Sequence, residues 1–233
     1  MHLKKLRSIF VYGLIAFSAA VHALEVDVGR ATISLNGENW QVVVDEKQEG
    51  TVTGGEARNF DIKQKTWFLT DGSKKVKAIL RIRGTASGIN SNYGVSFSGG
   101  CKKIEDLNVY TKDNTGGSLS QVDCLRIFQI NQSAGLLNQV YKAEQAYAKD
   151  KGMSLPSRGS FVTNTVTMSS GTFLDISIFA GEDWSGTSST AIEGIPATIK
   201  PEVAAWADEM AKAARGSVRS FSGKMVMPPL EFK

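Results

Sequence analysis

An acidic pair beside a tryptophan is the first place where this sequence could do chemistry. Glu182, Asp183 and Trp184 stand in the loop 181–186, directly after the largely apolar segment 173–180. Loops that a rigid strand positions often carry function, and carboxylates next to an indole are a composition that suits a sugar. Neighbouring carboxylates, however, do not establish the separation that a glycosidase needs. An ordinary capped loop and a ligand or partner contact are therefore the two main interpretations, ahead of catalysis.

A group of basic residues on one predicted strand is the second candidate site. Residues 74–83 alternate in character, so that one face is apolar and the other carries Lys75, Lys77, Arg81 and Arg83, with Ile79 among them. One interpretation is a solvated sheet face, whose charges also discourage edge-to-edge aggregation. The other interpretation is a contact for an anionic partner.

Histidine is absent after residue 23, because the chain has only His2 and His22. Serine–histidine and cysteine–histidine nucleophiles, histidine general bases, zinc-protease motifs and nearly all transition-metal sites are therefore excluded. Carboxylate chemistry, a lysine-activated serine and a calcium site of oxygen ligands remain, but no motif supports them. We accordingly expect no catalytic residue, no metal and no cofactor.

The two cysteines, Cys101 and Cys124, are expected to form a disulfide. An even cysteine count in an exported chain favours pairing, because compartments outside the cytoplasm are oxidising. The bond would tie the polar, glycine-containing excursion between them to the predicted strand 122–130. Pairing would also remove both thiols as metal ligands or nucleophiles, whereas two free buried thiols are the alternative.

The first 23 residues predict a secretory signal peptide. Cations at Lys4, Lys5 and Arg7 precede an apolar run, residues 9–20, and Val21-His22-Ala23 offers a cleavage site. The run is shorter than the roughly 20 residues that a membrane-spanning helix requires. We expect removal after Ala23 and a periplasmic or secreted protein without a stable membrane anchor.

The charge of the remaining chain argues against nucleic-acid binding. Three of the cations behind the formal net charge of +4 lie in residues 1–23, which contain no acid, so residues 24–233 carry +1. Nucleic-acid binding depends on clustered lysine and arginine that neutralise phosphates. A protein or another macromolecule of the cell envelope is the expected partner.

Strand patterns dominate the rest of the chain. Alternating apolar residues predict strands at 26–35, 40–44, 67–69, 76–83, 122–130, 161–168 and 172–180. Residues 45–58 hold little that could be buried and predict a loop. Helical spacing predicts two helices, one from Ser133 to Asp150 and one from about Pro201 to Ala214. Trp40, Trp67 and Trp206 occupy the apolar faces of these elements and are expected in the core.

The order of these elements predicts an α+β fold, an antiparallel sheet with two helices packed on one face and one disulfide. Residues 24–233 are long enough to bury a sizeable core, and no proline- or serine-rich linker divides them. We therefore expect a signal peptide, residues 1–23, followed by a single α+β domain, residues 24–233.

Because most catalytic and metal sites are excluded, a binding protein is the first functional hypothesis. It would be an exported, non-enzymatic envelope protein that binds another macromolecule in an inhibitor, immunity-type or assembly role. A broad exposed apolar patch would favour this hypothesis. The second hypothesis is a small-ligand-binding periplasmic module, which a deep pocket with convergent polar groups would favour. The third is a histidine-free carboxylate hydrolase acting on cell-wall material, which two carboxyl groups about 5–9 Å apart in a cleft would favour.

Overall fold

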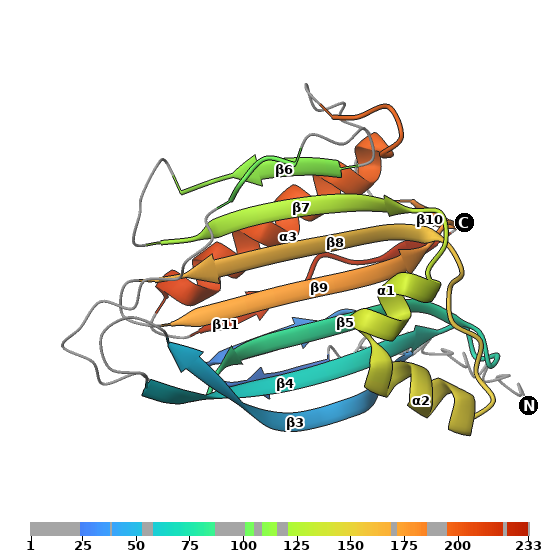
Figure 1. The fold of residues 1–233 in the computed structure, drawn as a ribbon, viewed down its shortest axis with the longest axis horizontal. Coiled ribbons are helices and arrows are strands. Elements are labelled where there is room, and N and C mark those ends of the chain that lie inside the picture. Colours follow the sequence, from blue (N-terminus) through green and yellow to red (C-terminus); the bar gives the residue numbers. More distant parts are fainter. Residues whose placement is uncertain are drawn as a thin grey trace, which may run out of the picture.

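A large antiparallel sheet runs through the middle of the computed structural model (Figure 1). The structure describes residues 24–37, 39–52, 58–86, 101–104, 109–115, 121–168, 172–185, 195–220 and 223–232. Within this part of the chain, the large sheet has seven strands in the order β3-β4-β5-β9-β8-β7-β6. They are β3 (Trp40–Val52), β4 (Arg58–Thr70), β5 (Val76–Thr85), β6 (Val109–Asp113), β7 (Asp123–Ile130), β8 (Gly159–Thr167) and β9 (Phe173–Gly181).

Two small sheets accompany the large one. The hairpin of β1 (Leu24–Val28) and β2 (Ala31–Leu35) gains a third strand, β11 (Lys224–Val226), which runs parallel to β2. The short strand β10 (Trp184–Ser185) pairs with β12 (Glu231–Phe232). The predicted α+β class and the antiparallel sheet are confirmed for the large sheet, and the small sheet adds one parallel pair.

Helices cover both faces of the large sheet, so the expectation of two helices on one face is wrong. Figure 1 shows α1 (Ala134–Gln139) and α2 (Lys142–Asp150) in front of the sheet and α3 (Pro201–Arg219) behind it. The reason is that β5 and β9 are apolar on both faces. Leu80 and Ile178 face the core that includes α3, whereas Ile79 and Phe179 face the core that includes α1 and α2. Each apolar face needs its own cover.

The single helix predicted for residues 133–150 is broken into α1 and α2 at Val140 and Tyr141. Tyr141 leaves the helical conformation, with φ −116° and ψ 39°, and its ring is completely buried against the sheet. The carbonyl of Val140 accepts a hydrogen bond from Arg81 on β5. The break therefore follows from contacts with a distant strand, which helical periodicity does not reveal.

Further elements differ from the expectation. Residues 26–35, predicted as one strand, form the hairpin of β1 and β2, and the strand predicted at 67–69 is the end of the longer β4. Residues 45–52, predicted as a loop, continue β3 and pair with β4, and the excursion after Cys101 contains the edge strand β6. Both are edge strands, whose outer side needs no apolar cover. Their polar sequences therefore lack the apolar alternation from which a strand is predicted. The helix α3 continues past the predicted end near Ala214 to Arg219.

The predicted disulfide between Cys101 and Cys124 is confirmed. None of the helices in the described part of the chain is long and apolar enough to span a membrane. The predicted signal peptide, residues 1–23, lies outside the described residues.

Replacing Gly29 with alanine is expected to lower the free energy of unfolding by about 1–3 kcal/mol. Gly29 forms the turn between β1 and β2 with φ +63°, and a Cβ atom there would lie 2.2 Å from the carbonyl oxygen of Thr85. Gly135→Ala in α1 is the matched control, because a Cβ atom there meets nothing within 4 Å. The control should raise stability by up to about 1 kcal/mol. Urea unfolding measures both, and equal effects would contradict the prediction.

Candidate functional site

The acidic loop and the basic residues before and at the start of β5 lie together at one end of the large sheet. Antiparallel pairing of β5 with β9 brings the first residues of β5 beside the last residues of β9. Asp183 lies 3.7 Å from the Nζ atoms of both Lys75 and Lys77, and Arg158 pairs with Glu182. These pairs border a depression of about 150 Å3. Most of these side chains are well exposed, so each pair contributes about 0–1 kcal/mol and forms a solvated ion-pair cluster.

Trp184 is in the core and not in an exposed loop, although the sequence suggested a surface contact. Its side chain is 1% exposed, and its ring packs edge-on against Trp206 with the ring centroids 4.9 Å apart. The short pairing of β10 with β12 places it there. The polar residues next to Trp184 in the sequence led to the prediction of an exposed loop. Because Trp184 is buried, it is unavailable for a ligand on the surface.

Arg81 forms a buried ion pair with Glu144 of α2. Glu144 is fully buried, and its Oε1 atom accepts hydrogen bonds from Arg81 Nη2 at 3.0 Å and from Thr66 Oγ1 at 2.7 Å. The guanidinium of Arg81 also lies over the ring of Tyr141, 4.5 Å from its centroid. Arg81 therefore holds α2 to the sheet and is not part of a solvated face.

Arg83 forms a second ion pair nearer to the surface. Its Nε and Nη2 atoms donate to Asp175 Oδ2 at 3.0 and 2.7 Å, and Asp175 Oδ1 accepts from Thr165 Oγ1 at 2.7 Å. Asp175 is nearly buried, whereas the Arg83 side chain remains 37% exposed. The pair fixes the direction of a guanidinium that solvent can still reach.

The two ion pairs border one depression, which we name the arginine depression. It has a volume of about 280 Å3 and lies between the sheet and the end of α1. Its lining consists of Arg81, Arg83, Gln139, Val140, Phe161, Asp175 and Ser177. Two of the four basic residues predicted as contacts, Arg81 and Arg83, therefore meet here, and Lys75 and Lys77 belong to the other cluster.

A strip of hydroxyl-bearing residues continues from the depression across the sheet. In this strip, which no described helix covers and which we name the open strip, Thr163 and Thr165 of β8 lie opposite Ser177 and Asp175 of β9. Among the described elements, α1 and α2 are the helices on this face, and they cover its other half (Figure 1). The disulfide to Cys124 holds residues 101–104 against β7 on the far side of the strip.

The three buried carboxylates of the described residues each pair with an arginine. Asp123 pairs with Arg215 of α3, and Glu144 and Asp175 pair as described above. In the same part of the chain, no group of three or more histidine, cysteine, aspartate or glutamate side chains is placed to hold a metal ion. The buried carboxylates thus serve ion pairing within the fold.

Tyr141 lies beneath the depression, and burial raises the pKa of its hydroxyl well above the ordinary value. Tyr141→Phe is expected to cost about 1 kcal/mol near pH 7, because the hydrogen bond to Ser177 Oγ at 3.2 Å is lost. Above about pH 10 the unfolded chain loses this proton first, so the wild-type free energy of unfolding falls as pH rises. The variant should lack this part of the slope. Urea unfolding at several alkaline pH values measures it, and equal slopes would contradict the prediction.

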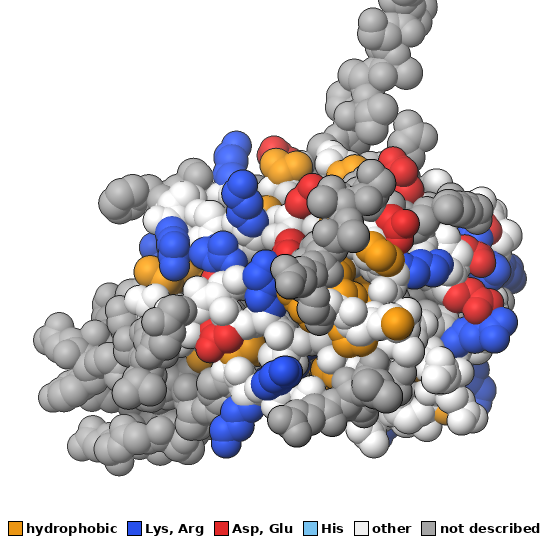
Figure 2. Space-filling model, turned by 90° about the horizontal axis from the view of Figure 1, so that it is seen from above, with side chains coloured by type: hydrophobic (Ala, Val, Ile, Leu, Met, Phe, Trp, Pro, Cys, Tyr) orange, Lys and Arg blue, Asp and Glu red, His pale blue; other side chains and the backbone are white. Residues whose placement is uncertain are grey.

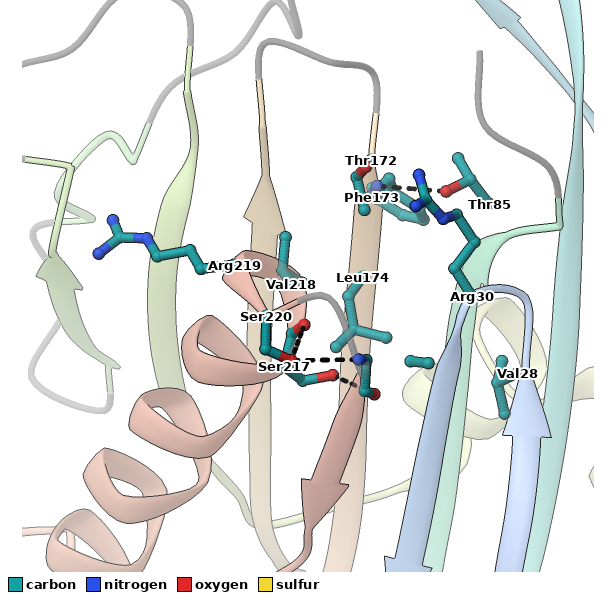
Figure 3. Close-up of a pocket in the computed structure, with 12 residues that line it drawn as sticks. Val28, Arg30, Thr85, Thr172, Phe173, Leu174, Ser217, Val218, Arg219 and Ser220 are labelled. Carbon is teal, nitrogen blue, oxygen red and sulfur yellow. Dashed lines mark hydrogen bonds between the residues drawn. The ribbon is translucent and has the colours of Figure 1, made fainter. Parts of the chain in front are cut away.

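Another cleft, of about 310 Å3, lies between the end of α3 and the turn of β1 and β2 (Figure 3). Arg30 and Arg219 lie on opposite sides of it, and Figure 3 shows Arg219 directed away from the cleft. Ser217 Oγ donates to the carbonyl of Gly223 at 2.6 Å, which is a structural contact. The charged groups do not converge here as they do in the arginine depression.

Exposed apolar side chains are scattered over the described part of the molecule. The large ones are Leu24, Val42, Ile104 and Val226, which lie in different segments. Figure 2 shows hydrophobic side chains interspersed with charged ones in the view from above. The described surface therefore offers polar and charged contacts more than a broad apolar patch.

Glu144, Asp175 and Thr165 are the site residues that the sequence interpretation missed. Glu144 falls within the apolar stripe of the predicted helix 133–150, and Asp175 falls within the largely apolar strand 173–180. The position of each carboxylate on a face predicted to point to the core could have indicated an ion pair, because a carboxylate is buried only when it is paired.

No protein-family model, curated protein or solved structure matches this chain. The functional conclusion therefore depends on the residues and geometry described above.

Proposed function

We propose that this protein is an exported, non-enzymatic envelope protein that binds another macromolecule through the open strip and the arginine depression. An inhibitor, immunity-type or assembly role fits such a protein. The expected signal peptide and the disulfide support the placement in a periplasmic or secreted compartment.

The observation that carries this proposal is the composition of the part of the sheet face that no described helix covers. Phe128 and Phe161 are partly exposed with ring centroids 5.8 Å apart, and the fixed guanidinium of Arg83 lies on the same face. Aromatic residues and arginine are enriched in protein interfaces. A sheet face with these residues and several hydroxyl groups suits a large partner that lies across the strands.

Affinity capture with a matched pair of variants tests the proposal. The oxidised protein is used as bait in envelope extract, beside Arg83→Gln on the open face and Lys212→Gln on the exposed side of α3. Mass spectrometry should identify a partner whose recovery falls at least about tenfold with Arg83→Gln and stays unchanged with Lys212→Gln. Equal recovery with both variants, or no retained macromolecule, would contradict the proposal.

A small-ligand-binding module is the second candidate function. The arginine depression supports it, because polar side chains from β5 and β9 and from α1 converge on about 280 Å3. Calorimetry with fractionated small molecules from the envelope tests it. A compound that binds with the macromolecular partner absent, and that Arg83→Gln weakens, would favour this candidate. The hydrolase hypothesis has the least support, because the buried carboxylates of the described residues pair with arginines.

A further inference from the structure

We infer that Arg83 binds a carboxylate carried next to an apolar side chain, as at the C-terminal residue of a partner polypeptide. The inference rests on the proposed function, because it names the chemical group of the partner that the arginine depression receives.

The guanidinium of Arg83 is anchored by hydrogen bonds along its Nε–Nη2 edge. Nε and Nη2 both donate to Asp175 Oδ2, and Thr165 holds the second oxygen of that carboxylate. Within the described residues, Nη1 of Arg83 makes no hydrogen bond. The Nη1–Nη2 edge therefore keeps two N–H donors in a fixed plane, and the side chain is 37% exposed.

Such an edge matches the geometry of a carboxylate. The two parallel N–H groups of a guanidinium form a bidentate pair with two carboxylate oxygens, and such charge-assisted bonds are short and strong. The carboxylates near the depression do not fill this role, since both Asp175 oxygens accept hydrogen bonds and Glu144 is occupied by Arg81 and Thr66. A ligand carboxylate would therefore meet two N–H donors that no described carboxylate occupies.

The remaining wall of the depression selects what accompanies the carboxylate. Phe161 lines it as a partly exposed ring that packs edge-on against Tyr141, with centroids 6.1 Å apart, and Val140 lies beside it. These side chains favour an apolar group. Ser177 accepts a hydrogen bond from Tyr141 and retains its own O–H for donation to a ligand oxygen. A volume of about 280 Å3 accommodates one side chain with its carboxylate.

A pair of peptides that differ only at the carboxyl end tests this inference. The 15N-labelled protein, expressed from the full chain and purified in oxidised form, is titrated with acetyl-Ala-Phe acid or with acetyl-Ala-Phe amide. The acid should shift the Arg83 Nε–Hε signal and the Ser177 amide signal saturably, and the amide should bind at least about tenfold more weakly. Equal binding of the two peptides, or no saturable shift at millimolar acid, would overturn the inference.

Variants of Arg83 test whether the two N–H donors of the Nη1–Nη2 edge are required. Arg83→Lys keeps the charge but loses the planar pair, and it should weaken the acid peptide about as much as Arg83→Gln does. Full binding by Arg83→Lys would overturn the bidentate geometry. The comparison of acid with amide on the wild-type protein needs no variant, so it stays decisive even if Arg83 variants fold poorly.

The two proposals fail in different ways. If the capture experiment finds a partner whose binding ignores both Arg83 and the peptide acid, the macromolecular function stands and the carboxylate inference is wrong. If the acid peptide binds as expected while envelope extract yields no partner, the macromolecular function is wrong and the carboxylate site stands.

Discussion

Glu144→Gln is expected to lower the free energy of unfolding by about 3–5 kcal/mol. The glutamate is fully buried and is the counter-charge of Arg81, whose side chain is only 13% exposed. Glutamine preserves the size of the side chain but leaves the guanidinium without a negative partner. An unpaired charge in such surroundings is far more costly than the loss of one hydrogen bond. Urea unfolding followed by circular dichroism measures the difference.

Two further variants show whether the loss comes from the charge. Asp150→Asn removes a carboxylate at the exposed end of the same helix and should change stability by less than about 0.5 kcal/mol. Adding Arg81→Met to Glu144→Gln removes the unpaired cation and should recover part of the stability, as replacement of buried ion pairs by apolar residues often does. The explanation is wrong if Glu144→Gln behaves like Asp150→Asn, or if the double variant is less stable than the single one.

The double replacement of Cys101 and Cys124 by serine is expected to cost about 3 kcal/mol. The disulfide joins residues 23 positions apart, and its closure reduces the conformational freedom of the unfolded chain. It also holds residues 101–104 on the face that carries the open strip. The serine variant should therefore unfold at lower urea concentration and should bind the captured partner more weakly.

Reduction of the wild-type protein provides an independent control. Dithiothreitol should lower the unfolding midpoint of the wild-type protein towards that of the serine variant and should leave the variant itself unchanged. A serine variant as stable as the oxidised wild type would show that the bond contributes nothing to stability. A midpoint that dithiothreitol lowers equally in both proteins would show that reduction acts elsewhere.

Local patterns predicted much of the fold. The alternation in 76–83, 161–168 and 172–180 identifies β5, β8 and β9, because a strand with a buried face must place apolar residues at every second position. The even cysteine count identified the disulfide. Polar edge strands were missed, since residues 45–52 have no face that must be fully buried.

Long-range contacts account for what the patterns did not predict. The break at Tyr141 depends on Arg81 and Ser177, which lie far away in sequence, and the face that each helix covers depends on the path of the chain across the sheet. For the candidate site, alternation correctly put Arg81 and Arg83 on one face. Their partners Glu144 and Asp175 lie on other elements, so the alternation within residues 74–83 could not identify which carboxylates pair with these cations.

The parallel pairing of β2 with β11 joins the beginning of the described chain to its end. Met225 lies opposite Ile33, and the indole N–H of Trp206 donates to the carbonyls of Pro228 and Pro229. A polypeptide that passes through a ribosomal tunnel or a translocation pore exposes β2 long before β11. The edge of β2 then stays unpaired until nearly two hundred further residues have emerged and β11 can pair with it. Vectorial emergence thus delays completion of the small sheet until β11 has emerged.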